Sequence, residues 1–324
     1  MDTCWSALNN GKATMYSGPA PTDTANTVAR IVRTVMAESR PALLRAALTG
    51  RRGEKENLRH KGNFLSEHDV RMHDRYRDLF AEALGSFVYA SEEDDPLIVG
   101  PDTDPDLLIL VDPLDTSELA VRALNGYTHV LLYSRCLRRP VAAVVGDIYH
   151  HVQLFIGCRH HDGEDRAYLI TADDDVYRLS TRRTPVSISQ ALITNYLMRP
   201  AERLQPIARQ QSLIDALTKP GADGPARGRI GVDFGSISLC HVAAGQTDAT
   251  VEFAKGFAIW DLSPGHYILH SAGGCVIDLH GKELSLDYGL DSLEDIAAAM
   301  KKRRTFIAAG AASLAHEILA CFEP

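Results

Sequence analysis

The hydrophobic residues change their spacing at Gly85, and this change constrains the fold more than any other feature of the sequence. Before Gly85, apolar side chains recur at helical spacing over about 22–48 and 67–84, which predicts two helices. After it, short runs rich in Val, Ile, Leu and Tyr alternate with turn residues, which predicts strands. The strands expected there cover 87–90, 107–111, 128–134, 141–147, 152–158, 168–171 and 176–179.

From about residue 186 the two kinds of segment alternate. We expect strands over 230–233, 249–253, 275–278 and 305–309, and helices over 200–217, 236–244, 261–271 and 311–322. This order predicts the α/β class, as an α+β layered sandwich of alternating helices and sheets. We expect a mobile leader (1–21), an N-terminal α+β domain (22–185) and a C-terminal α/β domain (186–324).

Composition excludes several roles. The 324 residues carry a formal net charge of −8, which argues against a general nucleic-acid or membrane-surface function, because both partners are polyanionic. No stretch approaches the roughly 20 apolar residues of a membrane-spanning helix. The six cysteines form no Cys-x-x-Cys pair, which favours buried free thiols in a reducing cytoplasm. The N-terminus has no secretory pattern, so we expect a cytoplasmic protein.

The most informative acidic residues follow the predicted strand 107–111. Asp112 ends this apolar run, so its carboxylate should lie at the carboxyl edge of the sheet. Asp115 is three residues further on, close enough for both carboxylates to bind neighbouring cations, and the Leu114 carbonyl would add another oxygen. Mg²⁺ prefers a few such oxygens and keeps several waters, which leaves room for a phosphate.

The two residues that come next would complete a phosphate site. The backbone amides of Thr116 and Ser117 would open a helix and face an anion. The Ser117 hydroxyl could pass a proton from a water held by the metal. Two metals that share an aspartate would form a clamp for in-line phosphoryl displacement.

An isolated Asp-Pro-x-Asp more often caps a helix, so the motif alone does not distinguish a metal site from a helix cap. Three further acidic sites change the balance: Glu92-Glu93 after a predicted strand, Asp261 at the start of an apolar helix, and Asp69 in the helix 67–84. Their order and spacing favour a metal centre.

This ordered set resembles the inositol monophosphatase family, whose relatives include fructose-1,6-bisphosphatase and 3′-nucleotidases. The resemblance covers roughly residues 61–274. The segments that carry it are Ser91-Glu92-Glu93, Asp112 to Ser117, Trp260-Asp261 to Gly274, Gly235-Ser236 to Ala249, Leu65 to Asp69, and Tyr127 to Val130. It implies an inositol monophosphatase-like fold, with most metal ligands in the N-terminal domain.

The resemblance also implies a set of metal ligands. Glu93, Asp112 and the Leu114 carbonyl would hold a first metal, and Asp112, Asp115 and Asp261 a second. Glu93 would also reach a third, more loosely bound metal and so act in catalysis. Two to three Mg²⁺ are implied, with Mn²⁺ as a substitute and Li⁺ or Ca²⁺ as inhibitors.

Catalytic and substrate-binding roles follow from the same resemblance. Ser117 would work with Asp69 to deprotonate the attacking water. Lys61 matches a lysine of a mobile loop near the metals. Thr116, Ser117 and Glu118 would contact the substrate.

Three positions depart from the family pattern. Thr116 replaces a glycine, which narrows the phosphate cradle and restricts the backbone angles. Glu118 places a negative charge beside the site, which either points away or binds a cationic or hydroxyl group. Lys255 stands near the position of a carboxylate that binds sugar or inositol hydroxyls, so inositol monophosphate is disfavoured. Lys255 would meet a second anionic group of the substrate, although a solvated lysine is the commoner role.

The sequence therefore predicts a Mg²⁺-dependent phosphomonoesterase that hydrolyses a small phosphate ester by a metal-activated water. The substrate would be a sugar, polyol or nucleoside phosphate, and the resemblance implies a homodimer without nucleic-acid or membrane partners. The alternative, motivated by Thr116 and Glu118, is a repurposed or non-hydrolytic member that binds a phosphorylated small molecule. A nuclease conflicts with the acidic charge and the lack of a basic tract.

Overall fold

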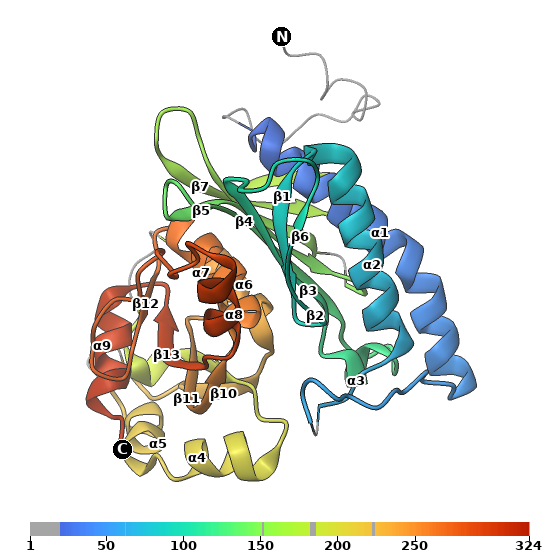
Figure 1. The fold of residues 1–324 in the computed structure, drawn as a ribbon. Helices are drawn as coiled ribbons and strands as arrows, with labels where there is room; N and C mark the ends of the chain where they lie inside the picture. Colours follow the sequence, from blue (N-terminus) through green and yellow to red (C-terminus); the bar gives the residue numbers. More distant parts are fainter. Residues whose placement is uncertain (1–19, 62, 151, 182–185, 222–223, 324) are drawn as a thin grey trace.

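The structure is a computed structural model that describes residues 20–61, 63–150, 152–181, 186–221 and 224–323 (Figure 1). Residues 1–19 of the predicted leader lie outside the described residues. Among the described residues, no helix combines the length and apolar character needed to cross a bilayer. The described cysteines are free, and only Cys158 and Cys240 of them are fully buried.

The first half of the chain forms a large mixed sheet of eight strands in the order β2-β1-β3-β4-β5-β6-β7-β8. Only β1 and β3 pair in parallel; the other neighbours are antiparallel. The strands are β1 Phe87–Ser91, β2 Asp94–Val99, β3 Leu107–Asp115, β4 Tyr127–Ser134, β5 Arg139–Asp147, β6 Val152–Arg159, β7 Asp165–Thr171 and β8 Val176–Leu179. All seven predicted strands are present, and β2 was not predicted because its Asp-Asp-Pro start lacks a strand pattern.

Two long helices cover one face of this sheet, α1 (Asp23–Thr49) and α2 (Glu67–Leu84) (Figure 1). Their apolar faces, including Val32, Met36 and Tyr76, are fully buried against the strands. Pro41 lies inside α1 without splitting it.

The second half forms a smaller sheet in the order β10-β9-β11-β13-β12. Its strands are β9 Leu192–Asn195, β10 Arg229–Val232, β11 Ala249–Phe257, β12 Cys275–Ile277 and β13 Arg304–Ala309. Strand β9 was not predicted, because it is short and precedes an irregular segment. Its backbone pairs in parallel with both β10 and β11.

Helices α6 (Gly235–Ala244) and α7 (Ile259–Ser271) pack between the two sheets. Helix α9 (Ala312–Ala320) covers the outer face of the small sheet, with α5 (Gln211–Thr218) nearby, while α8 (Leu293–Met300) contacts β2 and α7. The result is the predicted layered arrangement of helices and mixed sheets. Helix α7 contacts strands of both sheets, so the space between the sheets is one shared core.

The single helix predicted over 200–217 is wrong. The structure has a π-helical turn (Pro200–Leu204), a short α4 (Gln205–Ala208) and then α5. Arg199 enters this segment with a left-handed backbone (φ 77°), and Gln210 (ψ 70°) interrupts it again. This irregular segment supplies side chains to the site described next.

Candidate active site

Strand β3 ends at two carboxylates, Asp112 and Asp115, that face the same imidazole ring, that of His129. Regular alternation would put Asp112 and Asp115 on opposite faces, because residues three apart differ by an odd number of steps. The pairing of β3 with β4 shifts register between these two residues. His129 of β4 is fully buried, with its Nδ1 3.5 Å from Asp112 Oδ2 and its Nε2 3.4 Å from Asp115 Oδ2. The irregularity therefore brings both carboxylates to one side.

Two further elements direct carboxylates to the same place. Asp261 lies in the first turn of α7, where its Oδ2 accepts a hydrogen bond from the Ala258 amide at 3.2 Å. Ligand atoms of Asp112, His129 and Asp261 lie within 4.8 Å of one another. Glu92, in the turn after β1, lines the same pocket.

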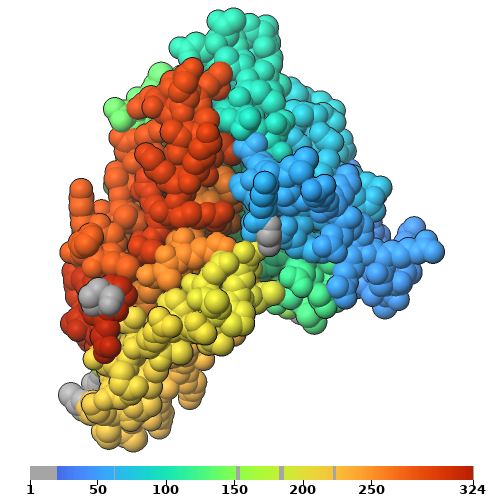
Figure 2. All heavy atoms as spheres, turned by 60° about the horizontal axis from the view of Figure 1, so that its bottom comes forward, coloured from blue at the N-terminus to red at the C-terminus, as the bar shows by residue number. Residues whose placement is uncertain are grey.

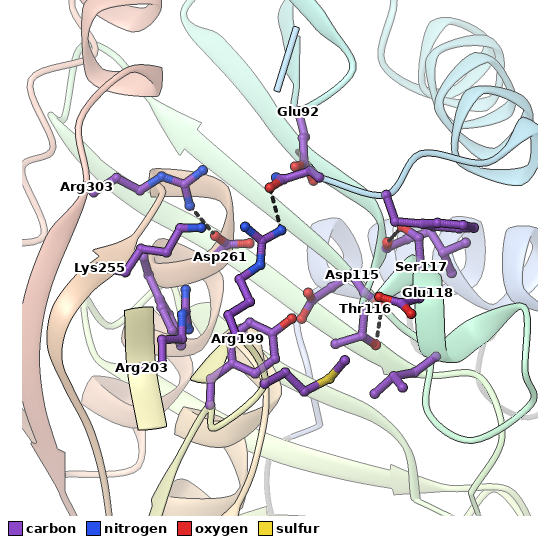
Figure 3. Close-up of a pocket in the computed structure, with 18 residues that line it drawn as sticks. Glu92, Asp115, Thr116, Ser117, Glu118, Arg199, Arg203, Lys255, Asp261 and Arg303 are labelled. Carbon is purple, nitrogen blue, oxygen red and sulfur yellow. Dashed lines mark hydrogen bonds and ion pairs between the residues drawn. The ribbon is translucent and has the colours of Figure 1, made fainter. Parts of the chain in front are cut away.

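The pocket has a volume of about 210 Å³ and opens between the two halves of the chain. Figure 3 shows the 115–118 segment on one side and the basic side chains on the other, with Asp261 among the basic side chains. The charged and hydroxyl residues that line it are Glu92, Asp115, Thr116, Ser117, Glu118, Tyr196, Arg199, Arg203, Lys255, Asp261 and Arg303.

The buried carboxyl groups raise one another's pKa values. Desolvation is the largest cause at Asp112, Asp115 and Glu92, and it raises each pKa well above the usual carboxyl range. The next cause is a neighbouring carboxylate, Glu92 for Asp112 and Asp261 for both Asp115 and Glu92. Like charges this close require protons or cations between them.

The donor set fits divalent cations. Asp112 Oδ1 and Asp115 Oδ2 are buried and have no hydrogen-bond partner among the described residues. An unsatisfied buried polar atom costs about 1–3 kcal/mol, and more when it is charged. Carboxylate oxygen is the ligand that Mg²⁺ and Mn²⁺ prefer, so a bound cation would satisfy both atoms and offset the repulsion.

Gly235, the first residue of α6, lies directly against this cluster. A Cβ at Gly235 would be 2.0 Å from Asp115 Oδ2 and 2.9 Å from His129 Cε1, and the backbone has φ +35°. Glycine is therefore the residue that leaves room for the Asp115 carboxylate.

Ser117 and Asp69 meet as predicted, although they are 48 residues apart. The Ser117 hydroxyl donates to Asp69 Oδ1 and also lies 2.7 Å from the Leu114 carbonyl. Asp69 is held from the other side, because its Oδ2 accepts from Ser66 N (2.8 Å) and Ser66 Oγ (2.6 Å) at the start of α2. Burial raises the pKa of Asp69 despite these hydrogen bonds.

The structure shows how the two departures after Asp115 are accommodated. Thr116 has φ 60° and ψ 39°, the left-handed region that glycine adopts easily and a β-branched residue rarely does. Its hydroxyl donates to the Asp115 carbonyl at 2.6 Å. Glu118 lines the pocket, but its charge is paired with Arg122 at 2.9 Å, and both side chains are partly exposed.

Two predicted site residues do not line the described pocket. Lys61 is exposed and does not line the described pocket, whereas Asn63 and Phe64 of the same loop do. Glu92 lines the pocket and Glu93 does not. The Glu93 pKa rises to about 7, because of burial and then the Asp69 charge. The structure thus favours Glu92 over Glu93 as the glutamate that faces the aspartates.

Sequence reasoning missed most of the basic side of the pocket. Arg199 and Arg203 come from the irregular segment that was predicted as a helix, and Arg303 precedes β13. Only Lys255 was expected there. The basic run Lys301 to Arg304 was a visible signal for Arg303, but nothing local indicates that it returns to Asp261.

The layered fold and the carboxylates at the end of β3 define the class of inositol monophosphatase and fructose-1,6-bisphosphatase folds. Fructose-1,6-bisphosphatase from Leishmania major superposes with a TM-score of 0.65 at 14% identity, covering 94% of this chain and 99% of that one. The suppressor protein SuhB from Bartonella henselae gives 0.61 at 21% identity, covering 90% and 98%.

A model of the inositol monophosphatase family matches residues 21–318, so the chain belongs to that family. Inositol monophosphatase 2 from Rattus norvegicus is 28% identical over 156 residues, 46% of this chain and 50% of the relative. The Nus factor SuhB from Pasteurella multocida is 27% identical over 186 residues, 57% and 62% respectively. A bifunctional NADP phosphatase/NAD kinase from Methanococcus maripaludis is 39% identical over 61 residues, 18% and 11%. The chain thus spans less than two thirds of the length of these curated relatives.

Proposed function

We propose that this protein is a Mg²⁺-dependent phosphomonoesterase that acts on a small phosphorylated metabolite, such as a sugar, polyol or nucleoside phosphate. The observation that carries the proposal is that Glu92, Asp115 and Asp261 line one pocket beside Ser117, with the buried carboxylate of Asp112 next to Asp261. Its membership of the inositol monophosphatase family, with phosphatases among its relatives, supports the same activity.

The carboxylates would hold the cations. Asp112 would be shared between cation sites, with Asp115 and Asp261 completing one, and Glu92 with the Leu114 carbonyl completing another. Bound Mg²⁺ supplies charge neutralisation at the phosphoryl oxygens and a lowered pKa for a water molecule. Glu92 takes the role that the sequence gave to Glu93, because it is the residue that faces the pocket.

Ser117 and Asp69 would move the proton of the attacking water. The Ser117 hydroxyl donates to Asp69, so its oxygen can accept a proton while its own passes to the carboxylate. Burial raises the pKa of Asp69, which makes this carboxylate a better proton acceptor. The two hydrogen bonds from Ser66 fix the orientation of Asp69.

A repurposed, non-hydrolytic member is the second candidate, and the strained Thr116 favours it. The double change Thr116→Gly with Glu118→Thr restores the family pattern. A large gain in phosphate release would support the repurposed protein, and a loss would show that both residues serve a native substrate.

The test is phosphate release from sugar, polyol and nucleotide monophosphates, with Mg²⁺ and with EDTA. Release that requires Mg²⁺ supports the phosphatase. No release from any ester, with cation binding intact, contradicts it. The homodimer, the cytoplasmic location and inhibition by Li⁺ or Ca²⁺ remain predictions.

A further inference from the structure

One side of the pocket is a wall of positive charge formed by Arg199, Arg203, Lys255 and Arg303 (Figure 3). They come from three parts of the second half: the irregular segment after β9, strand β11, and the residue before β13. They share the pocket with Asp115 and Ser117, so one small molecule can contact both sides at once.

Arg203 anchors the wall. Its side chain is 4% exposed and pairs with Glu252, which is 1% exposed, at 2.9 Å. Its guanidinium also lies 4.2 Å from the centre of the Tyr196 ring and 5.3 Å from that of Phe257. Arg203 is therefore held in place by internal contacts.

Lys255 and Arg199 converge on one carboxylate. Glu202 Oε2 is an ion-pair partner of Lys255 Nζ and lies 3.6 Å from Arg199 Nη1. Arg199 Nη2 also donates to Asn63 Oδ1 at 2.7 Å, across to the other half of the chain. Figure 2 shows the segment near residue 200 (yellow) meeting the loop near residue 63 (blue). Desolvation and the charges of Arg199 and Arg203 lower the pKa of Lys255, although Glu202 opposes this shift.

Arg303 faces the proposed cation site directly. Its Nη1 is 3.3 Å from Asp261 Oδ2, and its guanidinium lies 5.7 Å from the centre of the Trp260 ring. A cation bound by Asp261 would use the same negative charge, so the pairing of Arg303 with Asp261 would weaken in the loaded protein.

Three carboxylates, Glu202, Glu252 and Asp261, pair with these four cations among the described residues. The wall therefore carries about one positive charge in excess, and about two where Asp261 binds a cation instead. Hydroxyl groups of a neutral sugar or polyol would not match that charge, whereas an anion would. We infer that the substrate carries a second anionic group, a carboxylate or another phosphate, which Arg199, Lys255 and Arg303 bind while the scissile phosphate lies at the carboxylates. This inference rests on the proposed function for the position of the scissile phosphate.

Matched ligands test the inference. Glycerol 3-phosphate and 3-phosphoglycerate differ by a carboxylate, and fructose 6-phosphate and fructose 1,6-bisphosphate differ by a phosphate. Affinities are measured by isothermal titration of the full chain with Ca²⁺ in place of Mg²⁺, which separates binding from turnover. We expect the doubly anionic member of at least one pair to bind at least tenfold more tightly. The pair that shows this preference identifies the second group.

Two variants test whether the preference for the doubly anionic ligand comes from the basic wall. Lys255→Gln and Arg303→Gln should each reduce it at least threefold, while Lys219→Gln, an exposed lysine of the chain paired with Asp215, should leave it unchanged. Equal affinities within both pairs, or a preference that survives both pocket variants, would overturn the inference. Phosphate release from the same four esters with Mg²⁺ tests the phosphatase separately. A preference without hydrolysis would contradict only the phosphatase, and hydrolysis without a preference only this inference.

Discussion

Gly235 and Asp115 are packed so closely that a single methyl group cannot be placed between them: a Cβ on Gly235 would lie 2.0 Å from Asp115 Oδ2. The first residue of α6 thus determines where the last residue of β3 can direct its carboxylate. The contact connects an element of the second half to the acidic cluster of the first.

We predict that Gly235→Ala displaces the Asp115 carboxylate and lowers Mn²⁺ affinity by about tenfold or more. Isothermal titration with Mn²⁺ measures this. Gly289→Ala is the matched control, because Gly289 also has a positive φ (+68°) but no atom within 4 Å of its Cβ position. The control should lose about 1 kcal/mol of stability without a change in affinity. Equal Mn²⁺ affinities for Gly235→Ala and the wild type would contradict the prediction.

Thr116→Gly should stabilise the protein by about 1 kcal/mol, because it relieves a left-handed backbone at a β-branched residue. Urea unfolding of the metal-free protein measures the change. Ala123→Gly provides a comparison at another positive φ (56°) outside the described pocket lining, and its gain should be smaller because alanine is not β-branched. A loss of stability in Thr116→Gly would show that the hydroxyl bond to the Asp115 carbonyl outweighs the strain.

Substitutions of the two adjacent glutamates after β1, Glu92 and Glu93, should differ in their effect on Mn²⁺ affinity. Glu92→Gln should lower Mn²⁺ affinity by about tenfold or more, because Glu92 lines the pocket with Asp115 and Asp261. Glu93→Gln should have a smaller effect, because Glu93 does not line the described pocket and acts on Asp112 and Glu92 only through its charge. The two variants remove the same charge one residue apart, so each is the control for the other. A larger effect of Glu93→Gln would restore the assignment made from sequence.

His266 should contribute a loss of stability in acid. Burial lowers its folded pKa to about 3 from an ordinary 6.5, and its Nδ1 lies 3.0 Å from the Tyr288 hydroxyl. Between pH 6.5 and pH 3, His266 is protonated in the unfolded chain but neutral in the folded protein. Its contribution to stability is therefore fully present above pH 6.5 and decreases toward pH 3. At pH 5 the loss that His266 alone contributes is about 2 kcal/mol.

Urea unfolding at pH 7 and pH 5 tests this. The difference between the two pH values should shrink in His266→Gln and stay unchanged in His316→Gln, which alters an exposed residue of α9. An unchanged difference in His266→Gln would exclude His266 as its source.

Much of the site could be predicted because local pattern encodes it. Asp112 and Asp115 follow an apolar strand, Asp261 opens an apolar helix, and each lies in the site as expected. The sequence assigned Glu93 rather than Glu92, because adjacent residues in a turn differ only in direction and no local pattern gives that direction. The pairing of β1 with β2 shifts register just before this turn.

The basic wall was missed for a different reason. Arg303 meets Asp261 across 42 residues, and Arg199 meets Asn63 across 136. Such contacts depend on how the two sheets are assembled rather than on local spacing. Two proline-containing turns also replaced the regular helix that the apolar pattern over 200–217 predicted.

The most direct test of the account is phosphate release by Asp112→Asn at saturating Mg²⁺. The change removes one charge from the carboxylate at the centre of the cluster and keeps its shape. We predict that kcat/KM falls by about 100-fold or more, as for other losses of transition-state electrostatics. Asp102→Asn, an exposed change in the loop before β3, should retain wild-type activity. Activity of Asp112→Asn within a few-fold of the wild type would contradict a cation-dependent phosphatase centred on this carboxylate.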